Sequence, residues 1–299
     1  GCTSLVDFTI PENVKSIGMG AFAETGIETA TIPAQITAIG ESVFEDAKSL
    51  KTVTFVGNGV LSVGDNAFAG CEALNSITLP DSVTTIGNNA FEGCSAITTF
   101  ELPADLTEIG NNAFKDCVAL TGMAISEKVS KIGNNPFAGC TAFTTTSLTV
   151  SPDNPYYSVG DGWLLGDKGR KVLAAFVGEN KNVVMPEAIT SIGDFAFAYS
   201  DLASIDFGNV TYIGTFSFMN CNALTTLVIP EVITSVGFGT FMNCTALTSV
   251  TFQAGEMESI GAYSFAGCTA LTTVTFAGLG PQTTRMDCAF EDCTNIKSI

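Results

Sequence analysis

The stretch Cys71–Gly93, CEALNSITLPDSVTTIGNNAFEG, decides the fold because most of the chain repeats it. It returns almost unchanged as Cys94–Asp116, CSAITTFELPADLTEIGNNAFKD, and the same pattern starts again at Cys221, Cys244 and Cys268. Self-similarity at a short fixed period is the signature of a solenoid, in which each repeat forms one coil stacked on the next. The sequence therefore predicts one elongated repeat domain rather than two globular ones.

A glycine preceded by isoleucine or valine marks the repeats. These glycines are Gly18, Gly40, Gly64, Gly87, Gly110, Gly133, Gly193, Gly214, Gly237 and Gly261, and a phenylalanine lies four residues after each. Phe290 marks a degraded coil in which Met286 replaces the glycine. One step between successive glycines is 60 residues long and the others are 21 to 24. We therefore expect about eleven coils and one large insertion.

Each coil is predicted to make one circuit around a common core. Ile77 and Leu79 alternate with polar residues, which is the period of a strand with one buried face. Pro80 then ends the strand because it cannot donate to a ladder of backbone hydrogen bonds. A second extended piece, 83–86, places further apolar residues inside the coil.

The second half of the repeat is predicted to turn the chain back. Gly87–Asn89 holds the residue types that best take left-handed or turn conformations. The spacing of Ala90, Phe91 and Cys94 predicts one short helical or 3₁₀ turn before the next coil. Equivalent apolar residues, glycines, phenylalanines and cysteines of successive coils would then stack in buried ladders at about one strand spacing, roughly 4.8 Å.

The consensus L-x-x-I-x-I-P-x-x-V-T-x-I-G-x-x-A-F-x-G-C, whose strand part recurs at Leu247–Phe252 and Leu271–Phe276, resembles the BspA-like class of leucine-rich repeats. The resemblance spans essentially the whole chain. It implies a right-handed superhelix of mostly β, or β/α, coils with a parallel sheet, interrupted here by a β-hairpin insertion. We expect a single leucine-rich repeat domain over 1–299, with a first block of repeats over 1–148, the insertion over 149–182 and a second block over 183–299.

Nine of the ten cysteines occupy one repeat position, and only Cys288 lies outside it. A chemical role for these cysteines would be metal ligation, redox chemistry or stacked disulfides. In-register neighbours point their side chains in parallel, which suits packing better than the roughly 90° dihedral of a disulfide. Thr25, Ala47 and Ser200 replace the cysteine in some coils, so we interpret the position as a small buried packing residue.

Composition excludes several function classes. The 299 residues carry a net charge of −18 and no histidine. The charge disfavours nucleic acid and anionic membrane surfaces, and no direct membrane insertion is expected. The absence of histidine removes Ser-His-Asp and Cys-His catalysis and histidine metal sites. The carboxylates, among them Glu101, Glu108, Asp153, Asp161 and Asp167, form no recognisable catalytic set, so we expect no enzyme, no metal and no cofactor.

The outward residues of the first strand form one candidate binding surface. If Ile77 and Leu79 point inward, their neighbours point out from the parallel sheet, on the surface that is concave in leucine-rich repeats. The surface is rich in hydroxyls, although threonine is also simply a good solvent-facing strand residue. The candidate residues are Ser76, Thr78, Thr99, Glu101, Ser204, Asp206, Thr226, Ser249, Thr251, Thr273 and Thr275, with Gly122, Ala124 and Val228 at equivalent positions.

The insertion is the second candidate surface. Trp163–Leu165 and Val172–Phe176 flank a glycine-rich, charged stretch, which predicts a β-hairpin. The preceding Asn154-Pro-x-Tyr157 segment is similar to an element found between blocks of BspA-like repeats. Tyr156, Tyr157 and Trp163 are candidate anchors of a protein or glycan interface. The alternative is that they cover the flank of the solenoid.

The resemblance implies a non-enzymatic interaction and adhesion module on a cell surface or in a secreted protein, because family members are associated with binding of host extracellular matrix proteins. The expected partner is a protein, such as a host matrix protein, or a glycan. A structural spacer within a larger surface protein is the alternative. Gly1–Leu5 reads as the tail of a repeat, so we expect the chain to be a fragment of something longer.

Overall fold

The computed structural model describes residues 2–144, 146–160, 163–166, 172–176, 181–255, 257–278 and 287–298. The chain forms two compact units. Unit 1 consists of Gly1–Trp163 and Val177–Glu179, and unit 2 consists of Leu164–Phe176 and Asn180–Ile299. The division of one repeat domain at 1–148, 149–182 and 183–299 stays a prediction.

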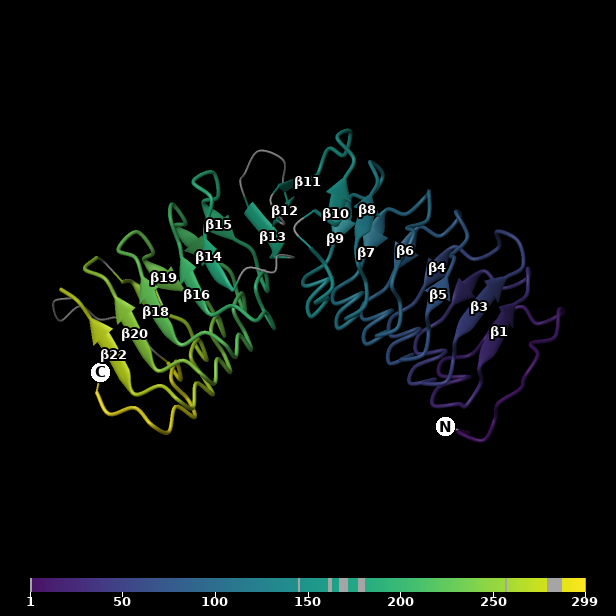
Figure 1. Cartoon of the computed structure of the whole chain (residues 1–299), viewed down its shortest axis with the longest axis horizontal. Helices are drawn as coiled ribbons and strands as arrows, with labels where there is room; N and C mark the ends of the chain where they lie inside the picture. The colour runs from purple at the N-terminus through teal and green to yellow at the C-terminus, as the bar shows by residue number, and fades with distance from the viewer. Residues whose placement is uncertain are drawn as a thin grey trace. The chain divides into compact units, whose positions relative to one another are not determined.

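Unit 1 is a stack of coils, most of which contribute two short strands (Figure 1). The first segments form a row of strands that runs along one side of the stack, and the second segments form a row on another side. The first row contains β1 (Thr29–Ile32), β3 (Thr52–Phe55), β5 (Ser76–Ile77), β8 (Met123–Ile125) and β10 (Leu148–Val150). The second row contains β2 (Ala38–Ile39), β4 (Ser62–Val63), β6 (Thr85–Ile86), β7 (Glu108–Ile109) and β9 (Lys131–Ile132).

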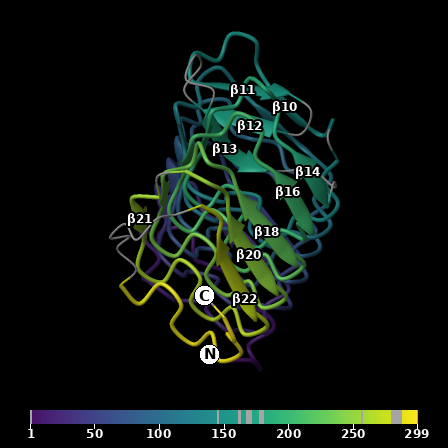
Figure 2. The same cartoon turned by 90° about the vertical axis from the view of Figure 1, so that its left-hand side faces the viewer.

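Unit 2 repeats the arrangement, and Figure 2 shows β18, β20 and β22 side by side with β21 on another side of the coils. The first row contains β14 (Asn182–Val184), β16 (Ser204–Asp206), β18 (Thr226–Ile229), β20 (Ser249–Phe252) and β22 (Thr273–Phe276). The second row contains β15 (Ser191–Ile192), β17 (Tyr212–Ile213), β19 (Ser235–Val236) and β21 (Ser259–Ile260). Pairing within both rows is parallel. The predicted parallel β-solenoid is therefore confirmed.

The insertion contains β11 (Tyr157–Gly160), β12 (Trp163–Gly166) and β13 (Val172–Phe176). Strands β12 and β13 are neighbours in one sheet, and β13 pairs in parallel with β15. Residues 167–171, which connect β12 to β13, lie outside the described residues. The hairpin therefore stays a prediction.

The short helical turn expected in each coil is absent, since the described residues contain no helix. In the coil that begins at Gly64, the N–H groups of Asn66 and Phe68 donate to the carbonyl oxygens of Asn88 and Ala90 in the next coil, both at 2.8 Å. The intervening N–H group, that of Ala67, closes a turn within its own coil on the carbonyl of Gly64 at 3.3 Å. A helix would need those N–H groups for bonds four residues back, so bonding between coils replaces it.

Left-handed backbone makes this turn possible. Asn66 and Gly70 have φ values of 55° and 70°, and the same two positions of the next coil, Asn89 and Gly93, have 52° and 71°. Asparagine and glycine are the residue types that adopt this region at least cost. The sequence interpretation of Gly87–Asn89 was right for Asn89.

Gly87 has a different role, which is close approach between coils. A Cβ atom at Gly110 would lie 2.5 Å from the carbonyl carbon of Gly87, and one at Gly87 would lie 2.7 Å from that of Gly64. The glycine ladder therefore lets each coil lie directly against the preceding one.

Buried ladders fill each unit. Phe44, Phe68, Phe91 and Phe114 are fully buried, and their rings stack with centroids 5.3 to 5.4 Å apart and interplanar angles of 5° to 9°. All ten cysteines are free, and those of the repeat position are buried except near the ends of the chain. Each buried thiol donates to a phenylalanine carbonyl of the preceding coil, for example Cys94 to Phe68 at 3.2 Å. The packing interpretation of the cysteine position is confirmed.

Candidate interaction surface

The first row of strands in unit 1 presents an ordered set of hydroxyl groups. Thr29 and Thr31 on β1 are in register with Thr52 and Thr54 on β3, and Thr52 is in register with Ser76 on β5. The residues between them, such as Val53 and Ile77, are buried, so the hydroxyls alternate outward as the period of a strand requires. We call the exposed residues Thr29, Thr31, Thr52, Thr54, Ser76 and Thr78 the hydroxyl face.

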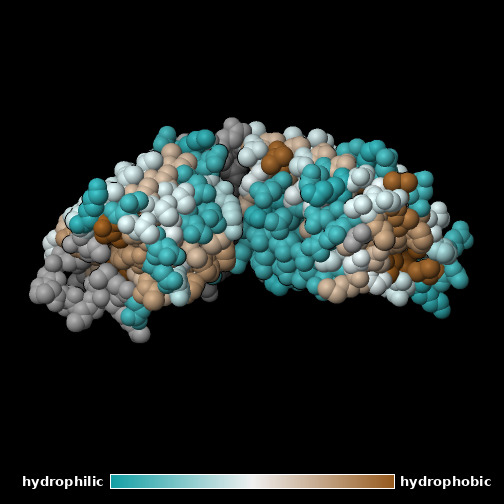
Figure 3. Space-filling view, turned by 90° about the horizontal axis from the view of Figure 1, so that it is seen from below, coloured by the Kyte–Doolittle hydropathy of each residue, from teal (hydrophilic) through white to brown (hydrophobic). Residues whose placement is uncertain are grey.

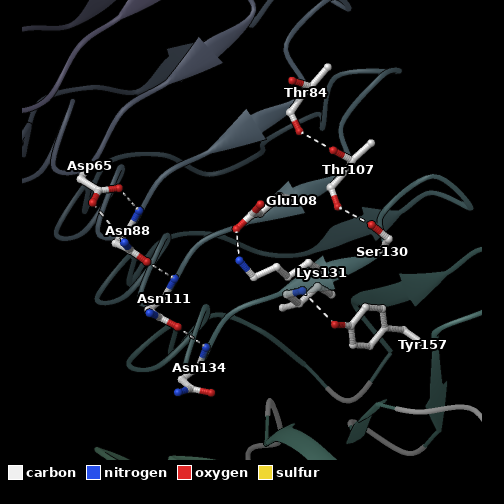
Figure 4. A network of polar contacts seen from close by, with 11 residues as sticks. Asp65, Thr84, Asn88, Thr107, Glu108, Asn111, Ser130, Lys131, Asn134 and Tyr157 are labelled. Carbon is white, nitrogen blue, oxygen red and sulfur yellow. Dashed lines mark hydrogen bonds and ion pairs between the residues drawn. The ribbon is translucent and has the colours of Figure 1, made fainter.

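Three threonines of the hydroxyl face have unused hydrogen-bonding groups. Within the described part of the chain, the hydroxyls of Thr52, Thr54 and Thr78 form no hydrogen bond with another protein group. By contrast, Thr107 Oγ1 donates to the carbonyl of Thr84 at 3.0 Å, and Ser130 Oγ donates to that of Thr107 at 3.4 Å (Figure 4). Those hydroxyls hold coils together, whereas the three threonine hydroxyls are available to a ligand. On the same face, Ser76 Oγ donates to Asn75 Oδ1 at 3.2 Å.

A groove of about 600 Å³ runs over β3 and β5 on this face. Thr52, Thr54, Ser76 and Thr78 line it, together with Asn58 and Asp81 from the turns that follow the two strands. The groove thus combines hydroxyls, an amide and one carboxylate with apolar residues, among them Phe55 and Pro80. Such a set suits a partner that offers many neutral donors and acceptors, each hydrogen bond contributing about 1 kcal/mol net.

Sequence reasoning found only part of this groove. It selected Ser76 and Thr78 but did not select Thr52, Thr54, Asn58 or Asp81. The signal was present, because Thr52-Val-Thr-Phe55 has the same letters as the selected segment Thr273-Val-Thr-Phe276. The turn residues carry no such signal, since only the fold places Asn58 and Asp81 at the end of the strands.

The hydroxyl face ends at the next coil of unit 1. Thr99 and Glu101 are exposed, but their segment is not a strand, and Phe100 between them is buried and packs edge-on against Phe91 and Phe114 at 4.9 and 4.8 Å. Ala124 on β8 is exposed but carries no hydroxyl, and Gly122 lies just before that strand. The predicted residues Thr99 and Glu101 therefore do not continue the groove.

The equivalent face of unit 2 is more apolar and less regular. Thr226, Thr273, Thr275 and Asp206 are exposed, while Ser204, Ser249 and Thr251 are half-buried. Ser204 Oγ donates to Asn182 Oδ1 at 2.8 Å, so that hydroxyl is already used. Val184 is 68% exposed in register with Asp206, and Val228 is 46% exposed in register with Thr251.

The predicted aromatic residues of the insertion fall into three environments. Tyr156 is 48% exposed, Tyr157 is half-buried and Trp163 is buried. Tyr157 Oη accepts a hydrogen bond from the N–H of Ile132 at 2.8 Å (Figure 4), and burial raises the pKa of its phenol. Ile132 belongs to β9, the last strand of the second row in unit 1, so Tyr157 satisfies a donor at that edge.

Asn154 anchors this edge contact. Its side chain is fully buried, and its Nδ2 donates to the carbonyl oxygens of Ser126 and Val129 at 2.7 and 2.9 Å. Its Oδ1 accepts the N–H groups of Tyr156 and Tyr157, both at 2.8 Å. The Asn-Pro-x-Tyr segment therefore covers the end of the first block of repeats, and of its aromatic residues only Tyr156 is substantially exposed.

Ion pairs between coils account for most of the lysines in unit 1. Lys48 pairs with Glu72 at 2.6 Å, Lys51 with Glu28 at 2.8 Å and Lys128 with Asp105 at 2.6 Å, while Lys131 pairs with Glu108 (Figure 4). Each pair is exposed and contributes at most about 1 kcal/mol. Each of these lysines pairs with a residue of an adjacent coil. No lysine lines the groove.

These coils, with a parallel strand row, glycine and phenylalanine ladders and a hydroxyl-bearing strand face, define a β-solenoid of the leucine-rich repeat class. The family model of the BspA-type leucine-rich repeat region matches residues 1–60, 49–154 and 174–299. The chain belongs to this family. Among curated proteins, none matches it significantly. The described residues include no helix that is both apolar and long enough to cross a membrane.

Solved structures support the fold. A leucine-rich repeat protein from Eubacterium ventriosum shares 27% identity, with 91% of this chain and 72% of that chain covered and a TM-score of 0.74. A leucine-rich cell surface protein from Faecalibacterium prausnitzii shares 28% identity, with 97% and 86% covered and a TM-score of 0.68. The pneumococcal vaccine antigen PcpA shares 21% identity, with 94% and 76% covered and a TM-score of 0.69, and so shows a common fold.

Proposed function

We propose that this protein is a non-enzymatic interaction module that binds a partner on the hydroxyl face, with the groove over β3 and β5 as its centre. The observation that carries the proposal is the difference between two sets of hydroxyls. The hydroxyls of Thr107 and Ser130 donate hydrogen bonds to carbonyl oxygens of the preceding coil. Those of Thr52, Thr54 and Thr78 have no hydrogen-bond partner among the described residues.

The chemistry of the groove favours a neutral polar partner surface. One carboxylate, Asp81, and one amide, Asn58, lie among four hydroxyl side chains. A matrix glycoprotein offers such a surface through extended backbone and through sugar hydroxyls, so a host extracellular matrix protein is the proposed partner. Adhesion through this face is the proposed role.

The proposed location is the cell surface or the extracellular space. The F. prausnitzii relative, whose name describes a cell surface protein, supports this location. Lack of enzymatic activity is part of the proposal, supported by the scaffold fold and by the absence of histidine from the sequence.

Biolayer interferometry with immobilised fibronectin, fibrinogen and glycan-stripped forms of both tests the proposal. Saturable binding to one of them is expected, and loss of binding after glycan removal would assign the contact to sugars. Absence of saturable binding to all of them would count against adhesion. Turnover of a glycan or peptide that a single carboxylate substitution removes would contradict the non-enzymatic role.

A further inference from the structure

A second surface lies on the turns that follow the second row of strands in unit 2. We propose that a row of aromatic side chains there, Phe195, Phe216, Phe238 and Tyr263, binds an arginine-rich segment of a partner protein. This surface is separate from the strand face of the proposed function and uses different chemistry.

The four rings form a continuous row across four coils, one from each. The centroids of Phe195 and Phe216 are 5.1 Å apart, those of Phe216 and Phe238 are 5.3 Å apart, and those of Phe238 and Tyr263 are 5.4 Å apart. Phe238 is 45% exposed and the other three rings are half-buried. The row is therefore an apolar stripe at the surface and not part of the core, where Phe197, Phe218, Phe241 and Phe265 already fill the phenylalanine ladder.

The corresponding turns of unit 1 carry polar residues instead. Phe195, Phe216 and Tyr263 occupy the position of Asn66, Asn89 and Asn112, two residues after the ladder glycine. Phe238 occupies the position of Asn88 and Asn111, whose side-chain oxygens accept backbone N–H groups of the next coil (Figure 4). Figure 3 shows a broad hydrophilic area over part of unit 1 on the face seen from below, an apolar patch toward the other end of that unit, and a mixture of apolar and polar surface over unit 2.

The aromatic residues are held in a conformation that bulky side chains rarely adopt. Phe195, Phe216 and Tyr263 have φ values of 57°, 53° and 59°. Asparagine tolerates this left-handed region, whereas an aromatic residue there is strained. Strained residues that persist at a surface point to a function of their side chains.

The third of these coils keeps the row continuous although its ring lies one residue earlier in the sequence. Gly239 occupies the position that carries a ring in the other three coils. A Cβ atom at Gly239 would lie 2.2 Å from Cε1 of Phe216. The ring of Phe216 thus lies over Gly239, and Phe238, one residue earlier, supplies the ring of that coil. The ring of Phe238 packs edge-on against the rings of Phe216 and Tyr263, at interplanar angles of 81° and 65°.

The charge around the aromatic row favours a cationic partner. The four turns, 193–200, 214–221, 237–244 and 261–268, contain no lysine or arginine. The coil after Tyr263 exposes Glu291 and Asp292, and its backbone is bonded to that of Tyr263 through the Tyr263 N–H and the Cys288 carbonyl at 3.3 Å. Residues 181–299 hold ten acidic and three basic residues. Aromatic rings in turns without lysine or arginine, within an acidic part of the chain, suit guanidinium groups, which stack on rings and pair with carboxylates, and they disfavour anionic partners.

Fluorescence anisotropy with the intact chain tests the inference. The probes are a labelled peptide of alternating arginine and serine, a lysine version and a glutamate version. We expect saturable binding of the arginine peptide, weaker binding of the lysine peptide because ammonium groups do not stack, and no binding of the glutamate peptide. The double variant Phe238→Asn/Tyr263→Asn, which installs the residues of unit 1, should lose about tenfold or more in affinity.

This double variant also separates loss of the site from loss of the fold. Asparagine relieves the left-handed strain at Tyr263, so circular dichroism and the melting temperature should match the wild type, and the single variant Phe238→Asn at the most exposed ring provides a milder test. Glu291→Gln/Asp292→Asn should weaken binding and flatten its salt dependence. Thr37→Val/Ser49→Val, at exposed residues of unit 1 outside both surfaces, should leave binding of the arginine peptide unchanged. Equal binding of the arginine peptide by wild type and double variant would mean that the acidic chain attracts the peptide without the rings. Binding of a neutral oligosaccharide in place of the arginine peptide would assign the row to glycans. Either result overturns the inference.

Discussion

The thiol of Cys117 donates a hydrogen bond to the carbonyl oxygen of Phe91 in the preceding coil over 3.1 Å, and the same oxygen accepts the N–H of Cys94 at 3.2 Å. One carbonyl thus closes the turn of its own coil and ties the next coil to it. Because this contact recurs along the cysteine ladder, the thiols act as buried donors between coils.

Burial of these thiols predicts loss of stability at alkaline pH. Burial raises the pKa of Cys71 and of Cys140 from 9.0 to about 12 in the folded chain. A group whose pKa is raised by folding contributes its full stabilisation below its unfolded pKa and loses it as the pH rises to the folded value. Between pH 9 and about 12 each such thiol should therefore lower the free energy of unfolding by ~1.4 kcal/mol per pH unit.

Urea unfolding across this pH range, in wild type and Cys71→Ala, measures the contribution. The variant should be less stable at neutral pH because of the cavity, but its stability should fall less steeply above pH 9. Parallel slopes for the two proteins would show that Cys71 ionises equally in both states.

Gly110 and Gly18 form a matched pair for the close approach of coils. A Cβ atom at Gly110 would meet the Gly87 backbone at 2.5 Å, whereas one at Gly18 would have no atom within 4 Å. We expect Gly110→Ala to destabilise the protein by about 3 kcal/mol, because the coils must separate, and Gly18→Ala to be neutral. Thermal unfolding followed by circular dichroism compares them, and equal melting temperatures would refute the steric role of the ladder glycine.

Ser217 and Ser264 occupy a position that is alanine in four coils of unit 1, at Ala21, Ala67, Ala90 and Ala113. Both hydroxyls are buried and have no hydrogen-bond partner among the described residues, whereas the hydroxyl of Thr240 at the same position donates to the carbonyl of Gly237 at 3.0 Å. We expect Ser217→Ala to stabilise the protein by about 1 kcal/mol and Thr240→Ala to destabilise it. Denaturant midpoints of the two variants should move in opposite directions, and a loss of stability in Ser217→Ala would contradict this account.

Tyr157 is predicted to protect the edge of β9. Removing its hydroxyl in Tyr157→Phe leaves the Ile132 N–H without its acceptor, at a cost of about 1–3 kcal/mol. Hydrogen exchange of the Ile132 amide should accelerate in this variant, while Tyr156→Phe at the neighbouring exposed residue serves as the control. Unchanged exchange in Tyr157→Phe would mean that the hydrogen bond does not protect this edge.

The fold was predictable because its determinants repeat. The alternation at Ile77 and Leu79 and the ladders of Gly87, Phe91 and Cys94 recur in coil after coil, so their interpretation rests on many copies. The helical turn was wrong because spacing alone cannot show where an N–H group bonds, and that of Phe68 bonds to the next coil.

The candidate site was predictable only in part. Ser76 and Thr78 follow from strand alternation, but the groove also needs Asn58 and Asp81, which lie in turns where the repeat varies. Trp163 illustrates the opposite limit, since an isolated aromatic residue in an insertion has the same letters whether it is exposed or, as here, buried. The strain at Phe195 and Tyr263 is a property of φ and has no signature in composition.

Binding by the hydroxyl face is tested most directly by biolayer interferometry on immobilised fibronectin and fibrinogen with two variants of equal charge change. Thr54→Lys/Thr78→Lys places two long cations in the groove, and Thr37→Lys/Ser49→Lys places them on exposed residues that do not line it. We expect saturable binding by wild type and by the second variant, and loss of binding by the first. Equal binding by all three proteins, or binding by none, would contradict it.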